Sequence, residues 1–213
     1  MKTDDFIAML ASGTEPVDLR ANARRYAVAV ASSVAGAAAL MMLFLGINPA
    51  LSGEIALPMF WVKVLFAAVV AVISIMAAVR LSRPGASLAG LPSALAAPLI
   101  AIWILAAIVL MNAQPSERAD LILGETWRVC PFLIATLSIP GFFASLWAMR
   151  GLAPTRLRLA GAAAGLLAGA LATLVYTLHC PELAAPFVGT WYLIGMLIPT
   201  TVGALIGPRV LRW

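Results

Sequence analysis

The chain has 213 residues, of which 63% are hydrophobic and only 11% are charged. A soluble domain has about 25% charged residues, so this composition excludes an ordinary water-soluble protein and indicates an integral membrane protein. The net charge is +5, but the basic residues are spread over the segments that flank the apolar runs rather than gathered in one basic domain, so the charge does not indicate direct nucleic-acid binding.

The first 25 residues are the only polar stretch long enough to bind a partner protein. Thr3 is a candidate N-cap, and Asp4 and Asp5 suit the positive end of a helix dipole, so a short helix is predicted here, with Gly13 as its end. The apolar side chains on one side of this predicted helix are those of Phe6, Ile7, Met9 and Leu10.

This N-terminal segment needs something to cover its apolar side chains, because a helix of about nine residues is marginal alone in water. Residues 1–18 contain four acidic residues against a single lysine, Lys2. An anionic membrane leaflet repels such a segment, so a basic protein partner is favoured over the membrane surface.

Six apolar runs follow, each close to the roughly 20 residues that a helix needs to cross a bilayer core of about 30 Å. The sequence therefore predicts an all-α integral membrane protein, in which a six-helix transmembrane bundle (residues 26–213) follows a cytoplasmic partner-binding segment (residues 1–25) with its short helix. The connections are too short to fold as separate domains. The predicted spans are at about 26–46, 59–79, 93–112, 129–149, 159–178 and 189–207.

The basic residues are distributed unevenly between the two sides of this predicted bundle. An even number of spans places both termini on one side, and eleven of the 14 Lys and Arg residues fall there. The positive-inside rule then places both termini in the cytoplasm. These residues are Lys2, Arg20, Arg24, Arg25, Arg80, Arg83, Arg150, Arg156, Arg158, Arg209 and Arg212.

The predicted membrane interior contains few groups that could do chemistry. Lys63 lies about one helical turn from the outer end of its span, so we expect its ammonium group to snorkel to the headgroups. Trp103 falls in mid-span, away from the aromatic belts, and is interpreted as a packing residue. The lack of a midplane acidic residue or histidine argues against a proton-coupled transporter.

The last two spans contain glycines spaced for close helix contact. We expect their partner to be another span of the same chain rather than a second copy. The glycines are Gly161, Gly165 and Gly169 in the fifth span, and Gly203 and Gly207 in the sixth. The residues predicted to kink the fourth and sixth spans are Pro140, with Gly141, and Pro199.

The chain has two cysteines, Cys130 and Cys180, and both are predicted to lie at the outer membrane boundary. Four interpretations are open: buried small hydrophobes, a structural disulfide, a labile thiol pair that responds to oxidants or thiophilic metals, and a metal site. His179 is adjacent to Cys180 and could join a transient metal site, but a closed structural zinc site needs four ligands. No firm metal site and no cofactor are predicted.

The N-terminus also resembles a known family. The pattern MKTDDxIxxL at residues 1–10, the pair Pro16-Val17 and the pair Arg24-Arg25 resemble the negative regulator of sigma F (NrsF) family of six-span bacterial anti-sigma factors. The resemblance extends over the whole chain, including the two cysteines near the outer ends of the fourth and fifth spans.

The resemblance implies a regulatory function with an input and an output. The N-terminal segment would sequester an extracytoplasmic-function sigma factor at the membrane, and stress sensed by Cys130 and Cys180 would release it. The residues implied in sigma-factor binding are Asp4, Asp5, Phe6, Ile7 and Leu10.

Two other function classes are weighed against this one. The alternative is a small-solute transporter or permease-like protein, because a bundle with kinked helices can form a passage. An enzyme is not expected, because the chain has no paired carboxylates in its spans and a single histidine for acid–base chemistry.

Overall fold

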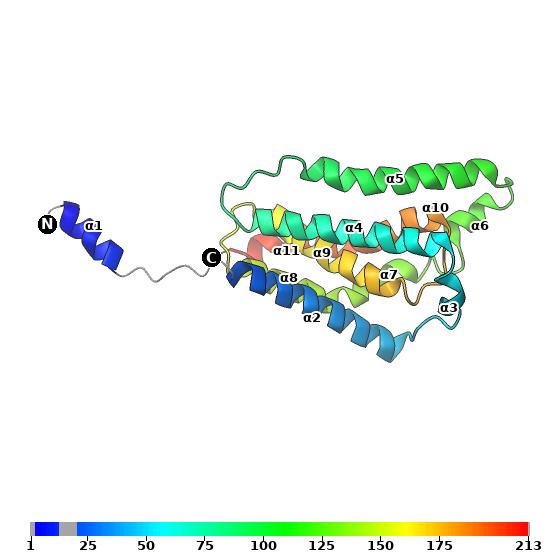
Figure 1. Ribbon diagram of the computed structural model, residues 1–213, viewed down its shortest axis with the longest axis horizontal. Coiled ribbons are helices and arrows are strands. Elements are labelled where there is room, and N and C mark those ends of the chain that lie inside the picture. The colour runs from blue at the N-terminus through cyan, green and yellow to red at the C-terminus, as the bar shows by residue number, and fades with distance from the viewer. Residues whose placement is uncertain (1–2, 13–20, 213) are drawn as a thin grey trace.

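The computed structural model describes residues 3–12 and 21–212, and within these ranges helices are the only regular secondary structure (Figure 1). This confirms the all-α prediction. Five helical segments are long and apolar enough to cross a membrane. They are α2 (Ala21–Phe44), α4 (Pro58–Leu81), α5 (Leu91–Asn112), α9 (Leu157–Tyr176), and a continuous run of α10 (Ala185–Phe187), the π-helical turn η1 (Val188–Tyr192) and α11 (Leu193–Val210). The short helices are α1 (Thr3–Ser12), α3 (Leu51–Glu54) and α6 (Arg118–Leu123).

The predicted span at 129–149 is divided into two helices, α7 (Cys130–Leu137) and α8 (Ile139–Arg150), which are bent by 44°. The break lies at Ser138, where Pro140 is the second residue of α8, because proline lacks an N–H for the helix ladder and its ring clashes with the preceding turn. The kink predicted at Pro140 is therefore confirmed. The pair is a sixth candidate span only when its two helices are counted as one.

Helix α9 lies at the centre of the bundle, and its glycines pack directly against α11. A Cβ atom added at Gly161 would lie 2.0 Å from the Gly203 carbonyl oxygen, and one added at Gly165 would lie 2.0 Å from the Pro199 carbonyl oxygen. Backbones approach this closely only where no side chain intervenes. The glycine seam, which we define as the α9–α11 contact at these residues, confirms the expected partner within the chain.

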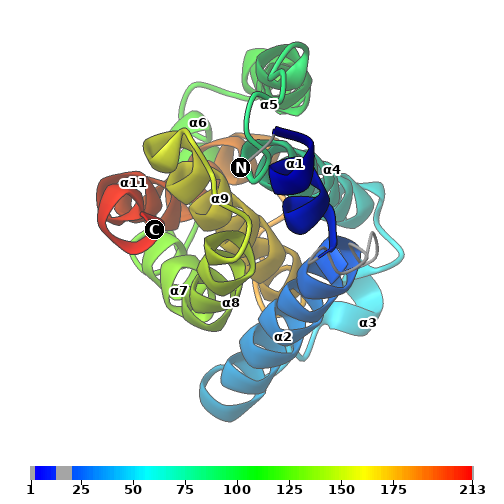
Figure 2. The same cartoon turned by 90° about the vertical axis from the view of Figure 1, so that its left-hand side faces the viewer.

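Helix α5 lies at the rim of the bundle, as the end-on view in Figure 2 shows. Only 11% of its apolar window is buried, against 78% for α9. Trp103 packs only partly, because its Cε2 atom would lie 3.8 Å from a Cβ atom at Gly189 of η1 while 47% of the residue is exposed. Helix α5 contacts its neighbours along one side only, and most of its surface faces the surroundings.

The two ends of the bundle differ in composition. At one end α2 and α9 begin and α4, α8 and α11 finish (Figure 1), and we call it the arginine end. Its basic residues on the helices are Arg24, Arg25, Arg80, Arg150, Arg158 and Arg209. At the opposite end α7 begins and α9 finishes, so Cys130 and Cys180 lie there, and we call it the thiol end.

Candidate functional site: a buried thiol pair

The structure brings the two predicted thiols together at the thiol end. Cys130 is the first residue of α7, and Cys180 lies just beyond the last turn of α9. Both are free thiols with 0% of their surface exposed. The Cys130 and Cys180 side chains lie close enough together to affect each other's ionisation. Residues that are far apart in the sequence are therefore neighbours inside an apolar bundle.

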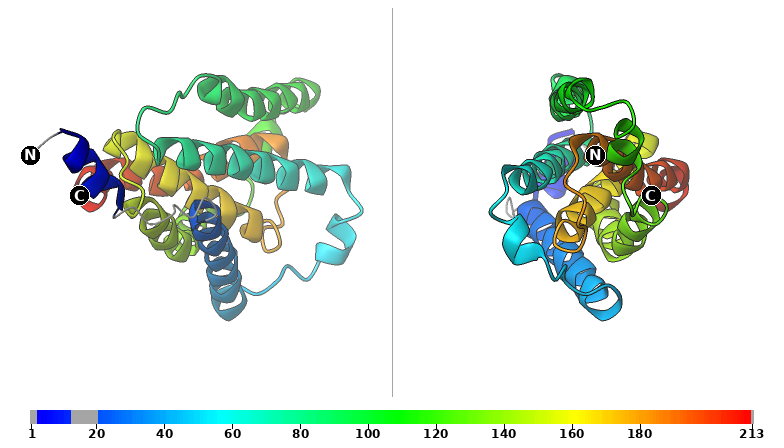
Figure 3. Two further views of the ribbon diagram at one scale, coloured as in Figure 1. Left: turned by 60° about the vertical axis from the view of Figure 1, so that its left-hand side comes forward. Right: turned by 90° about the vertical axis from the view of Figure 1, so that its right-hand side faces the viewer.

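The backbone around each thiol is fixed by its own helix. The Cys130 N–H donates to the Thr126 carbonyl oxygen over 2.9 Å, and the Cys180 N–H donates to the Tyr176 carbonyl oxygen over 3.0 Å. The chain then passes from Cys180 to Glu182, and this connection crosses the middle of the thiol end (Figure 3, right). We call residues Cys180, Pro181 and Glu182 the thiol turn.

Lys63 of α4 holds the thiol turn, contrary to the prediction that it snorkels. Its side chain is 0% exposed, and its Nζ donates to the carbonyl oxygens of Cys180 over 2.7 Å and Glu182 over 3.4 Å. The prediction failed because it used the depth of Lys63 along α4 and not the face of α4 on which Lys63 lies. That face points at the carbonyl groups of the thiol turn.

The ammonium charge of Lys63 is paired with a buried carboxylate. The Oε2 atom of Glu54, on the short helix α3, lies 3.6 Å from the Lys63 Nζ. The Glu54 Oε1 atom accepts a 2.6 Å hydrogen bond from the side-chain amide of Asn48, and the Asn48 N–H donates to the Leu178 carbonyl oxygen over 3.1 Å. The connection from α2 to α4 therefore covers the site and supplies the counter-charge that a buried ammonium needs.

Glu182 ties the thiol turn to the segment that leads into α7. Its Oε1 atom accepts hydrogen bonds from the backbone N–H groups of Glu125 over 2.7 Å and Thr126 over 3.2 Å. The preceding Gly124 has a φ of 57°, and a Cβ atom there would lie 2.6 Å from the Glu182 Oε1. A glycine is required at this turn both for its backbone conformation and for the close approach of the carboxylate.

Aromatic side chains lie beside the pair. Tyr176 and Tyr192 are buried, their ring centroids are 6.0 Å apart, and both interact with the two thiols. Trp127 and Trp191 pack against each other with centroids 5.2 Å apart, and the Trp191 Nε1 donates to the Ile122 carbonyl oxygen over 2.8 Å. Two buried tyrosines therefore adjoin the thiols, and a pair of packed tryptophans lies at the same end of the bundle.

These surroundings make Cys180 the more acidic thiol. The neighbouring thiol of Cys130 lowers the pKa of Cys180 to about 7, with further help from the Tyr192 hydroxyl, the Glu182 N–H and the Lys63 charge, and against the effect of burial. The thiolate is the reactive form of cysteine, so Cys180 is the expected nucleophile of the pair.

His179 does not join the two thiols. Its Nδ1 atom lies 3.0 Å from the Gly46 carbonyl oxygen, and its ring packs on Tyr176 with centroids 5.7 Å apart. Among residues 3–12 and 21–212, no group of three or more His, Cys, Asp or Glu side chains is placed to hold a metal ion. The arrangement thus does not assemble the transient metal site of Cys130, Cys180 and His179.

The predicted N-terminal helix is present as α1, which begins at Thr3 and has Asp4 and Asp5 in its first turn. The side chains of Asp4, Asp5 and Ile7 are exposed, and Ile7 has 58% of its surface accessible. The predicted contacts of Phe6 and Leu10 concern side chains outside the described set, as do the predictions for residues 13–20.

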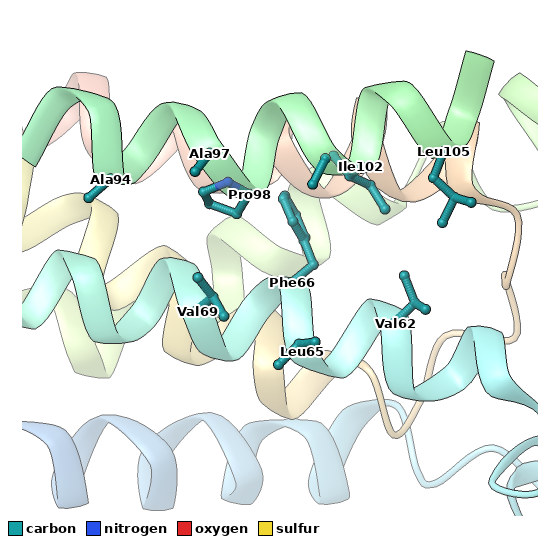
Figure 4. Close-up of a pocket in the computed structure, with 10 residues that line it drawn as sticks. Val62, Leu65, Phe66, Val69, Ala94, Ala97, Pro98, Ile102 and Leu105 are labelled. Carbon is teal, nitrogen blue, oxygen red and sulfur yellow. The ribbon is translucent and has the colours of Figure 1, made fainter. Parts of the chain in front are cut away.

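A cavity of about 440 Å³ lies between α4 and α5 (Figure 4). None of the residues that line it has a polar side chain, so it offers no group that would bind or select a polar solute. The lining residues are Val62, Leu65, Phe66, Val69, Ala94, Ala97, Pro98, Ala101, Ile102 and Leu105.

Comparison with known proteins gives matches over the whole chain. A family model described as "Negative regulator of sigma F" matches residues 10–213. A protein of Azospira oryzae named probable anti-sigma-F factor NrsF is 54% identical over 213 residues, and one of Caulobacter vibrioides named anti-sigma-F factor NrsF is 38% identical over 221 residues. Each alignment covers 100% of both chains. No solved structure matches the chain.

Proposed function

Because this chain belongs to the negative regulator of sigma F family, we propose that it is a membrane-bound anti-sigma factor with a thiol input and a protein-binding output. It would sequester an extracytoplasmic-function sigma factor through the N-terminal segment and release it when stress changes the state of Cys130 and Cys180. The observation that supports this most strongly is full-length similarity to two proteins named as anti-sigma-F factors. That name describes a regulator and not an enzyme.

We place the chain in the bacterial inner membrane with six spans, counting α7 and α8 as one, and with the arginine end in the cytoplasm. Five apolar helices, the bent pair and the positive-inside rule support this topology. Single cysteines in a Cys130→Ser, Cys180→Ser background would test it, because Gln114 and Ser87 are exposed near opposite ends. An impermeant maleimide should label Gln114→Cys on intact cells and should label Ser87→Cys only after lysis.

The N-terminal segment supplies the proposed sigma-factor contact. Asp4 and Asp5 are exposed on the first turn of α1, where they suit a basic protein surface. Phe6, Ile7 and Leu10 would fill an apolar groove of the partner, as the apolar residues of short recognition helices do.

Deletion of residues 2–12 tests this contact. Membranes with the shortened chain should retain the bundle but should no longer co-purify the sigma factor. A matched control is the double variant Glu117→Gln, Asp120→Asn, which removes two acidic charges from the thiol end and should leave binding intact. Continued co-purification after the deletion would refute the docking proposal.

Oxidation of the thiol pair is the proposed input. Two adjacent thiols lose two protons and two electrons to an oxidant, and one bond forms between their sulfur atoms. Bond formation pulls the start of α7 toward the turn after α9. Closely packed helices respond to such a pull by a discrete shift of about 1–2 Å rather than by continuous bending. We propose that this shift reaches the cytoplasmic end of the bundle and loosens the hold on the sigma factor.

The transport alternative has less support. The apolar cavity beside α5 has a lining that offers neither an ion ligand nor a hydrogen-bond donor for a solute. The buried charged side chains of the described residues, those of Lys63 and Glu54, lie instead beside the thiol turn.

A further inference from the structure

We infer that Lys63 and Glu182 are positioning residues for the thiol pair, a role that rests on the proposed thiol input. They hold the thiol turn from two sides, Lys63 from α4 and Glu182 from the segment that leads into α7. Neither residue reacts. Each fixes the backbone that determines where the Cys180 sulfur lies relative to Cys130.

The Lys63 contact is specific to the thiol turn. Its ammonium group lies 2.7 Å from the Cys180 carbonyl oxygen and 3.4 Å from that of Glu182, so it binds both ends of a three-residue turn. A buried charge costs several kcal/mol unless it is well paired, whereas an apolar side chain of similar length would fill the space without this cost. Packing alone therefore does not account for a lysine with 0% of its surface exposed, but the capture of two carbonyl groups does.

The Glu182 contact connects the same turn to the other cysteine. Its carboxylate accepts hydrogen bonds from the N–H groups of Glu125 and Thr126. The carbonyl oxygen of Thr126 in turn accepts a 2.9 Å hydrogen bond from the N–H of Cys130. This chain of hydrogen bonds joins the turn that contains Cys180 to the first residue of α7. It runs through the backbone and is independent of the two sulfur atoms.

The geometry of disulfide formation explains why such positioning matters. The two sulfur atoms must approach to about 2.05 Å with a Cβ–S–S–Cβ angle near ±90°, so a small displacement of either backbone slows the reaction. Pro181 fixes one φ angle between the two held residues. The thiol turn thus has little freedom left once Lys63 and Glu182 are in place.

The test measures how fast the pair oxidises in membranes that contain the full chain. Diamide accepts the two protons and two electrons of the thiols and becomes the corresponding hydrazine, and the Cys130–Cys180 bond forms. The yield is followed by blocking the remaining thiols with a mass-tagged maleimide in detergent. The variants are Lys63→Met and Glu182→Ala, with Leu65→Met on the exposed side of α4 and Glu117→Ala at the same end as matched controls.

We expect Lys63→Met and Glu182→Ala to slow disulfide formation by about tenfold or more, because misplacement by about 1 Å reduces the rate of a positioned reaction strongly. The two control variants should oxidise at the wild-type rate. Glu182→Gln keeps an oxygen that accepts N–H groups and should stay within about threefold of the wild-type rate. All variants should hold the sigma factor before diamide is added.

Wild-type oxidation rates in both Lys63→Met and Glu182→Ala would overturn the inference. If Lys63→Met fails to insert, the ordering of Glu182→Ala and Glu182→Gln decides the matter, since equal rates for these two contradict it. A different result would contradict the proposed thiol input: the sigma factor would stay bound to wild-type chain after its disulfide has formed.

Discussion

The thiol end and the arginine end of this bundle differ in whether their charged groups are buried or exposed. At the thiol end, Lys63, Glu54 and both cysteines are buried and bound to one another or to backbone groups. At the arginine end the charges lie mostly at the surface, and α2, which comes after the N-terminal segment in the chain, begins there. A buried, preorganised cluster suits a chemical input, and an exposed, charged end suits the recognition of a protein.

Tyr26 is a buried polar anchor at the arginine end, and it holds the start of α2. The Tyr26 hydroxyl donates to the Ala78 carbonyl oxygen over 3.0 Å and also contacts the Ser82 hydroxyl, so it ties α2 to the last turn of α4. Lys63 lies near the other end of the same helix. Helix α4 therefore contacts the thiol turn at one end and the first residues after the N-terminal segment at the other.

The largest effect is expected from breaking the glycine seam between the two ends. In Gly165→Leu the new Cβ would lie 2.0 Å from the Pro199 carbonyl oxygen, and backbone cannot move aside as a flexible side chain can. We expect a loss of about 3 kcal/mol or more in the free energy of unfolding, measured by SDS titration in mixed micelles. Gly189→Ala is the matched control, because its Cβ would meet Ile102 at an ordinary 3.6 Å. An unchanged unfolding transition for Gly165→Leu would contradict the close α9–α11 contact at the glycine seam.

The next largest effect concerns the pH dependence of thiol oxidation at the thiol end. With the pKa of Cys180 lowered to about 7, the thiolate is present above that pH and is lost as the pH falls below it. The rate of oxidation by diamide should therefore rise with pH with a midpoint near pH 7. An ordinary cysteine would give a midpoint at about pH 8.5. Tyr192→Phe should move the midpoint upward, because it removes a hydroxyl that helps to lower this pKa. Tyr26→Phe, at the arginine end, should leave it unchanged, and a midpoint near 8.5 in the wild type would contradict the described site.

A smaller effect is expected from Tyr26→Phe on stability. The change removes the hydroxyl that binds Ala78 and Ser82, while the Ser82 hydroxyl keeps its own 2.8 Å bond to the Ala78 carbonyl oxygen. One lost buried hydrogen bond costs about 1 kcal/mol, so SDS titration should show a decrease of about 0.5–1.5 kcal/mol. A decrease that matches that of Gly165→Leu would mean that the anchor, and not the seam, holds the ends together.

The smallest loss of stability is expected from removing one arginine–tryptophan contact, and it should be equal at the two ends. The Arg25 guanidinium carbon lies 5.6 Å from the Trp147 ring centroid at the arginine end, and that of Arg128 lies 5.1 Å from Trp127 at the thiol end. Exposed contacts of this kind contribute about 0.5–1 kcal/mol, so Arg25→Gln and Arg128→Gln should each lower the unfolding free energy by no more than that. A much larger loss for Arg25→Gln alone would reveal a further role for the arginine end.

The sequence predicted the parts of this fold that depend on one helix at a time. Apolar length located the helices, Pro140 located the kink in the fourth span, and the spacing of Gly161 and Gly165 indicated a close partner. These features are local, because span length, proline geometry and glycine spacing act within one helix or on its immediate neighbour.

The features that the sequence missed depend on how each helix is rotated. The depth of Lys63 in the membrane predicts snorkelling, but its side chain points inward to the thiol turn. Trp103 packs against the bundle on one side only, and 47% of the residue is exposed. Glu182 gave no signal in the sequence, because its partners are backbone N–H groups of Glu125 and Thr126, which any residue types could supply. The shared depth of Cys130 and Cys180 was the one site feature that the sequence contained.

The most direct measurement is the amount of sigma factor that co-purifies with the chain from membranes before and after diamide treatment. We expect wild-type chain to release the sigma factor as the Cys130–Cys180 bond forms, and the Cys130→Ser, Cys180→Ser variant to retain it under the same treatment. Release from the double variant to the same extent as from wild type would show that the buried thiol pair is not the input.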